Sequence, residues 1–258
     1  MSVWILTAII ILIALVMTMT GRGGGNFYVL TLALAGYNMN LSASTGQFIL
    51  MCSSLMAAIL FTKQKMNHWK LTIILGVMVF LSAMAGGYFG KYFDEKLLKS
   101  IFAVVMFIAA LLILRKPKQK LPNDRKWIIV LKTGNENYYV NLLVTIPIVL
   151  TTGFISGMVG VSGGSFLLPL MLLTMNVPMH VAVATSTTLV SISASAGFFG
   201  HLGAGIFDPQ LALPLALGGL AGGAIGAKMA LKSKPKNLKY LFAGTQLIAS
   251  IIIIIKIL

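Results

Sequence analysis

The sequence predicts an all-α polytopic integral membrane protein made of two inverted repeats of about five transmembrane segments each, the second segment of each repeat being a short helix that begins with glycine. Composition, an internal repeat and the placement of basic residues lead to this fold class. The 258 residues are 58% hydrophobic and only 10% charged, too few charges to cover a water-soluble globule of this length. Residues 137 to 207 contain no Asp, Glu, Lys or Arg.

Several apolar runs are long enough to be ordinary spanning helices. They are Val3 to Thr20, Leu41 to Phe61, Leu71 to Gly90, Leu98 to Leu114, Val140 to Val159, Val181 to Gly200, Leu211 to Ala230 and Leu238 to Ile255. The first run has neither a basic stretch before it nor a small-residue cleavage site after it, so we expect a retained span and not a secretion signal. Two further runs, Asn26 to Tyr37 and Ser165 to Val177, are too short to cross at about 1.5 Å per residue unless the membrane thins or loops dip inward.

The two halves of the chain repeat one pattern about 140 residues apart. Gly23-Gly24-Gly25-Asn26-Phe27 matches Ser162-Gly163-Gly164-Ser165-Phe166, and Leu98 to Ala103 matches Leu238 to Ala243. We therefore divide the chain into a first transmembrane repeat (1–115), a basic cytoplasmic linker (116–139) and a second transmembrane repeat (140–258). Glycines with small-xxx-small spacing are predicted to let helices approach closely; they are Gly86, Gly90, Gly222 and Gly226.

The loops differ sharply in charge, and basic loops stay on the cytoplasmic side of a membrane. Residues 63–70, 115–139 and 228–239 carry most of the formal net charge of +15, whereas 91–99 and 201–208 carry little. If the short segments cross, each repeat has five crossings, the second repeat is inverted and all the basic loops lie inside. We therefore predict external termini, and we expect no nucleic-acid partner because topology accounts for the positive charge.

The short segments are the first candidates for a binding site. Each begins with glycines and a small polar residue, so the backbone N–H groups at its start are sterically open and the helix dipole adds partial positive charge. Half-helix ends of this kind meet near the midplane of transporters with inverted repeats. We therefore predict that an oxyanion is held between the two segments, by Gly24, Gly25, Asn26, Gly163, Gly164 and Ser165.

Other polar residues adjoin these segments. Arg22 either pairs with an anionic substrate or marks the cytoplasmic mouth, and the second repeat has Val161 at the matching position. Hydroxyl and amide side chains near the start of the following spans either cap and join neighbouring helices or offer neutral donors to a substrate. The candidates among them are Thr45, Gln47, Thr185, Ser186 and Thr187.

The acidic residues restrict the function. All five lie in or beside loops, so no spanning helix offers a carboxylate to a metal cation or a proton relay. His201 and Asp208 are expected to be solvated loop residues, with proton coupling as the alternative. No HExxH, Walker or paired Cys–His spacing occurs, so we expect neither an enzyme nor a metal or other cofactor.

The stretch from Gly153 to Gly205 carries the most specific pattern. Its residues are Gly153-Phe154-Ile155-Ser156-Gly157-Met158-Val159-Gly160, then Gly163-Gly164-Ser165-Phe166 with Pro169, then Pro178 and Ala182-Val183-Ala184-Thr185-Ser186. This pattern resembles the TauE/SafE sulfite exporter family of membrane permeases, and the resemblance covers essentially the full chain. It implies movement of sulfite, sulfonates or related small anions across the bacterial plasma membrane.

The predicted function is thus a secondary permease or exporter for small anions, with the lipid bilayer as its environment. Two alternatives stay open: an anion-selective channel with the same glycine constriction, and a non-transporting membrane scaffold protein. A homo-oligomer is compatible with the sequence, which does not specify the oligomeric state.

Overall fold

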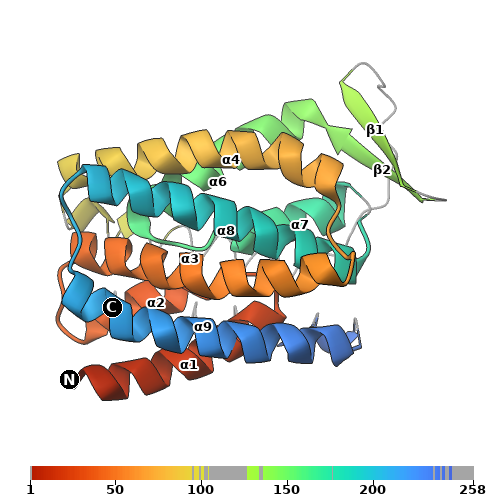
Figure 1. Ribbon diagram of the computed structural model, residues 1–258. Coiled ribbons are helices and arrows are strands. Elements are labelled where there is room, and N and C mark those ends of the chain that lie inside the picture. Colours follow the sequence, from red (N-terminus) through yellow and green to blue (C-terminus); the bar gives the residue numbers. More distant parts are fainter. Residues whose placement is uncertain are drawn as a thin grey trace.

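The computed structural model describes residues 2–94, 127–133, 136–175 and 177–234, with 96–98, 100–101, 104, 236–238, 240–241 and 244–245. Most of the predicted spans 98–114 and 238–255 and most of the linker lie outside the described residues. The described chain is mostly helical (Figure 1). Its helices are α1 (Val3–Met19), α2 (Gly25–Leu34), α3 (Met39–Lys63), α4 (Trp69–Phe89), the 3₁₀ helix η1 (Gly90–Tyr92), α6 (Leu142–Val159), α7 (Gly164–Thr174), α8 (Met179–Gly203) and α9 (Pro209–Lys232).

Five of the described helices are long and apolar enough to cross a membrane: α3, α4 with η1, α6, α8 and α9. Their outward faces carry large exposed apolar side chains, among them Ile73, Leu81, Leu143 and Leu217. Apolar side chains on the outside of a bundle face lipid in a membrane protein. The chain is therefore a mostly helical membrane protein.

The long helices lie side by side along one direction (Figure 1). Helices α3 and α8 pack against each other at the centre, α4 packs against α8 and α6, and α9 packs against α3 and α1. Glycines allow close backbone approach at these contacts. A Cβ atom on Gly86 of α4 would lie 1.9 Å from the carbonyl oxygen of Phe154, and one on Gly226 of α9 would lie 2.2 Å from that of Leu15.

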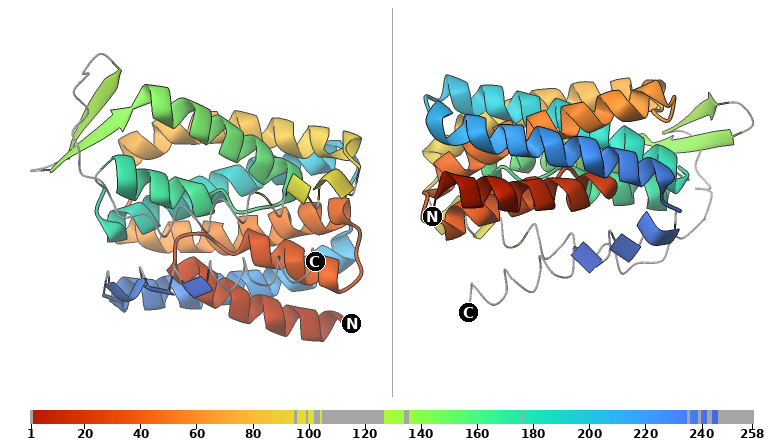
Figure 2. Two further views of the ribbon diagram at one scale, coloured as in Figure 1. Left: turned by 180° about the vertical axis from the view of Figure 1, so that it is seen from behind. Right: turned by 60° about the horizontal axis from the view of Figure 1, so that its bottom comes forward.

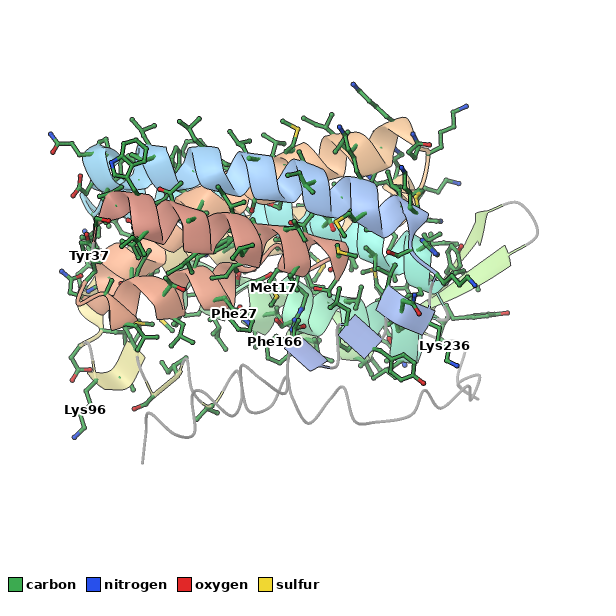
Figure 3. All side chains as sticks on the ribbon, turned by 90° about the horizontal axis from the view of Figure 1, so that it is seen from below. Met17, Phe27, Tyr37, Lys96, Phe166 and Lys236 are labelled. Carbon is green, nitrogen blue, oxygen red and sulfur yellow. The ribbon has the colours of Figure 1, made fainter. Side chains whose placement is uncertain are left out.

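Helices α1 and α2 form a hairpin that returns the chain to the end of the bundle where it began. Met17 and Phe27 lie near the middle of the bundle, whereas Tyr37, after α2, lies at the end where α1 starts (Figure 3). Helices α6 and α7 form the second such hairpin, since the N–H of Tyr139, just before α6, donates to the carbonyl oxygen of Met175 at the end of α7 (3.4 Å).

This arrangement corrects the prediction that the short segments cross. At about 1.5 Å per residue, the 10 residues of α2 and the 11 of α7 cover about half of a bilayer core. Each short helix therefore starts inside the bundle and returns to the end from which its hairpin entered.

A two-stranded antiparallel hairpin, which the all-α prediction missed, precedes α6. Strand β1 (Ile128–Thr133) pairs with β2 (Glu136–Asn141), so α6 begins at Leu142 and not at Val140. The sequence contained a pattern typical of such a hairpin, with β-branched and aromatic residues on both sides of a Gly-Asn pair.

The basic loops gather at one end of the bundle. The β-hairpin, the α3–α4 loop and the end of α9 share one end, whereas the chain from α4 through η1 and the α8–α9 loop lie at the other (Figures 1 and 2). The basic end carries Lys63, Lys65, Lys70, Lys228 and Lys232.

Candidate functional site

The two glycine-rich segments, 139 positions apart, lie in contact inside the bundle. The side chain of Asn26 joins them: its Oδ1 accepts from the backbone N–H of Ser162 (2.6 Å), and its Nδ2 donates to Oγ of Ser165 (3.1 Å). The hydroxyl of Ser162 donates to the carbonyl oxygen of Arg22. The starts of α2 and α7, predicted to face each other, are therefore tied together by side chains at their first turns.

Glycine is required at this contact by the closeness of the backbones. A Cβ atom on Gly164 would lie 2.9 Å from both the Cα of Arg22 and the carbonyl oxygen of Gly21, and one on Gly25 would lie 2.9 Å from the carbonyl oxygen of Gly160. Gly163 is different, because its φ is −57° and the nearest atom to a Cβ there would be 3.6 Å away. Gly164 and Gly25 are thus sterically constrained, whereas Gly163 has room for a methyl group.

Both short helices begin without a side-chain cap. Their N-cap residues are Gly24 and Gly163. Within the described ranges, the backbone N–H groups of Gly23, Gly24, Gly25, Gly163 and Gly164 donate to no protein acceptor, although all of these residues are buried. Buried N–H groups at membrane depth are costly without an acceptor. This cluster of donors, at the positive ends of two helix dipoles, can bind an oxyanion.

Arg22 lies inside the bundle and not at its mouth. The residue is 2% exposed, and its guanidinium donates to Oγ1 of Thr20 (3.4 Å) and of Thr245 and contacts Sδ of Met17. The alternative that Arg22 marks the cytoplasmic mouth is therefore wrong. Its positive charge lies in the same loop as Gly23 and Gly24.

The polar residues of α8 divide into two groups. Ser186 belongs with the glycine segments, since its Oγ donates to the carbonyl oxygen of Gly21 (2.9 Å). Thr187 donates to Val183 within its own helix (2.8 Å), and Thr185 accepts from the backbone N–H of His68 in the α3–α4 loop (3.2 Å). The hydrogen bonds of Thr185 and Thr187 are therefore structural.

Of the two candidates on α3, Gln47 lies beside the second glycine segment, whereas Thr45 makes no hydrogen bond to either segment. Nε2 of Gln47 donates to the carbonyl oxygen of Ser156 (2.5 Å), and the hydroxyl of Ser156 donates to the carbonyl oxygen of Val161 (2.5 Å). Gln47 is thus linked to the second glycine segment through one residue. Thr45 is fully buried, and its Oγ1 contacts no described hydrogen-bonding group.

The sequence did not indicate the structural positions of Ser162 and His201. Ser162, which matches Gly23 in the repeat, makes the bonds to Asn26 and Arg22 that hold the segments together. His201 was expected in a solvated loop, but it lies in α8 and is 0% exposed. Within the described ranges, no group of three or more His, Cys, Asp or Glu side chains could hold a metal ion.

His68 gives the basic end of the bundle a pH-sensitive contact. Its Nδ1 caps α4 by accepting the N–H of Leu71 (3.1 Å), and its ring lies edge-on to that of Tyr138. Burial lowers the pKa of His68, because the charged imidazolium loses hydration. Protonation would also remove the Nδ1 lone pair that caps the helix.

We expect the stability of the protein to fall as the pH drops below about 6.5, the ordinary pKa of histidine. A lowered pKa means that the unfolded state binds the proton more readily, so the stability from His68 is present above that pH and lost below it. Melting temperatures in detergent between pH 8 and pH 5 would measure the loss. His68→Asn keeps a capping oxygen but does not titrate, and an equal decline in this variant would refute the assignment.

The chain is similar in sequence to known membrane proteins over most of its length. The model of the family described as "Sulfite exporter TauE/SafE" matches residues 6–253. A "Probable membrane transporter protein YunE" of Bacillus subtilis is 26% identical over 204 residues, which cover 77% of this chain and 74% of the relative. A "Probable membrane transporter protein" of Xylella fastidiosa is 24% identical over 188 residues, which cover 72% and 69%.

A third relative, from Methanocaldococcus jannaschii, is also named a probable membrane transporter protein and is 21% identical over 216 residues, 80% of this chain and 76% of the relative. No solved structure matches the chain. The family and the names of the relatives indicate a membrane transporter and not an enzyme, and the resemblance noted around Gly153 to Gly205 is confirmed. The chain belongs to the sulfite exporter TauE/SafE family of membrane proteins.

Proposed function

We propose that this protein is a secondary permease that moves a small oxyanion, such as sulfite or a sulfonate, across a bacterial plasma membrane. The observation that supports this most strongly is the cluster of buried N–H groups at the joined starts of α2 and α7. A bound oxyanion would supply the acceptors that these groups lack among the described residues.

The charges near the site favour an anion over a cation. The sequence has no acidic residue before Asp94 and none between Glu136 and Asp208, so the α1–α2 and α6–α7 hairpins and the helices α3, α4 and α8 carry no carboxylate. Arg22 is the one charged residue of the two glycine segments. A positive charge and two helix dipoles, away from water, attract an anion more strongly than they would at a surface.

We further propose that the two halves are inverted repeats that rock against each other around the site. The helix contacts support this, because exchanging the halves turns the α1–α9 contact into the α6–α4 contact and the α3–α9 contact into the α8–α4 contact. Each hairpin also turns at a glycine with a φ of 76°, Gly21 and Gly160. Movement of one half against the other would open the site to each side in turn.

If the two repeats are inverted, matching positions in them lie on opposite sides of the membrane. Gln64 and Ala204 are the C-cap residues of α3 and α8. In chains with Cys52 replaced by Ala, we expect Gln64→Cys to react with an impermeant maleimide only from the cytoplasm and Ala204→Cys only from outside. Reaction of both from the same side of intact cells would show that the repeats are parallel.

Flux measurements test the proposed function. Proteoliposomes loaded with [35S]sulfite, thiosulfate or sulfoacetate should release at least one anion at a saturable rate, and an opposing gradient of unlabelled anion should drive counterflow. A channel would give flux without counterflow. A scaffold protein would give no flux of any anion despite correct insertion.

A further inference from the structure

His201 is a buried titratable side chain that the anion site does not use. It lies near the end of α8, and its imidazole is completely shielded from solvent. Nε2 of His201 is 2.9 Å from the carbonyl oxygen of Gly157 in α6. A carbonyl oxygen only accepts hydrogen bonds, so Nε2 carries the hydrogen and Nδ1 holds the free lone pair. Nδ1 is buried and has no partner among the described residues.

Gln47 of α3 makes the same kind of contact with the preceding carbonyl group of α6. Its Nε2 donates to the carbonyl oxygen of Ser156, the residue before Gly157, and its Oε1 is buried without a donor in the described chain. Two side chains from α3 and α8 are therefore held by consecutive carbonyl groups of α6. Each presents a buried acceptor atom that receives no hydrogen bond from the described residues. Buried polar atoms without a partner are uncommon.

A row of small and polar residues on one face of α8 runs from His201 towards the second glycine segment. Ser193, Gly197 and His201 are spaced by four and share one face of the helix, with about 12 Å between the first and the last. The hydroxyl of Ser193 lies 3.0 Å from that of Ser156, and both lie 3.7 Å from the position of a Cβ on Gly163. A Cβ on Gly197 would lie 2.9 Å from Nε2 of Gln47.

The charged and titratable groups on the elements around His201 are engaged elsewhere. The ammonium of Lys91 lies over the rings of Tyr88 and Tyr92 at 4.6 and 5.1 Å. The carboxylate of Asp208, in the α8–α9 loop, accepts the N–H groups of Gln210 and Leu211 at the start of α9. Helix α6 has no charged residue, and α3 contributes the neutral Gln47.

We propose that His201 is the proton-carrying residue of the permease, joined to the anion site by Gln47, Ser156 and Ser193. Nδ1 takes a proton from water at the end of the bundle formed by η1 and the α8–α9 loop, becomes an imidazolium, and gives the proton back to water on the opposite side when the halves rock. An O–H bond of hydronium breaks as the Nδ1–H bond forms, and on the opposite side the Nδ1–H bond breaks as a water molecule becomes hydronium, so no oxidation state changes. One proton then accompanies each anion, so a pH gradient drives transport.

The test rests on the proposed function and uses 35S-labelled thiosulfate and sulfoacetate, which stay fully ionised near neutral pH, in proteoliposomes with the membrane potential held at zero. With the outside one pH unit more acidic than the inside, one proton per anion supports up to about tenfold accumulation. The native chain and His180→Gln, the same change at the other end of α8, should accumulate the transported anion. His201→Gln can keep the bond to Gly157 but cannot take a proton, so it should exchange labelled for unlabelled anion without gradient-driven accumulation.

A chain in which His68→Asn and His180→Gln leave His201 as the only histidine should accumulate the transported anion like the native chain, a result that does not depend on the folding of any His201 variant. Exchange without accumulation in the native chain or in this double variant would overturn the proposal and leave the permease standing. Accumulation by His201→Gln would also overturn it. A native chain that neither exchanges nor accumulates any tested anion would overturn the proposed function itself.

Discussion

Replacing Gly164 by Ala is expected to reduce anion flux at least tenfold, whereas replacing its neighbour Gly163 by Ala should leave the flux close to native. A methyl group on Gly164 would lie 2.9 Å from the Cα of Arg22 and from the carbonyl oxygen of Gly21. Both of these are backbone atoms, so the two hairpin tips would have to move apart. Overpacking of this kind typically costs about 1–3 kcal/mol, and here it would also displace the N–H groups that we assign to the anion.

Gly163 provides the matched control, because a methyl group there meets nothing closer than 3.6 Å and its backbone is already in the helical region. The measurement is the initial rate of [35S]sulfite efflux from proteoliposomes, divided by the amount of inserted protein. Equal rates for the two variants would mean that the contact between the segments does not shape the site.

Replacing Asn26 by Asp is expected to abolish flux while preserving the fold. The two side chains have nearly the same shape, and a carboxylate can still accept the N–H of Ser162 while the Ser165 hydroxyl rotates to donate. The new negative charge, however, would lie beside the N–H groups that we assign to the anion. Two unit charges about 4 Å apart repel by about 4 kcal/mol at an effective dielectric constant of about 20, which corresponds to about a thousandfold loss of affinity.

Asn38→Asp supplies the same change of charge outside the site. Asn38 caps α3 by accepting the N–H of Leu41 at 2.8 Å, and aspartate caps helices about as well as asparagine. Concentration-dependent flux would compare the two variants. Native affinity in Asn26→Asp, or an equal loss in Asn38→Asp, would place the anion elsewhere.

The repeated glycine segments were visible in the sequence because they are local patterns. Gly24 and Gly25 reappear as Gly163 and Gly164, each pair ahead of an apolar run too short to cross. Apolar composition and the absence of acidic residues from the spans likewise indicated a membrane transporter. These properties follow from residue type and spacing alone, so they could be inferred before any contact was known.

The bonds of Asn26 to Ser162 and Ser165 could not be inferred in this way, because they join positions more than 130 residues apart and depend on how two hairpins enter the bundle. The same packing placed Arg22 in the interior, joined Thr185 to His68 and buried His201 against Gly157. Sequence determined that the chain lies in a membrane and carries two short helices that begin with glycine. Tertiary structure decided which side chains surround them, because burial and hydrogen bonding in a bundle depend on neighbours that local spacing does not specify.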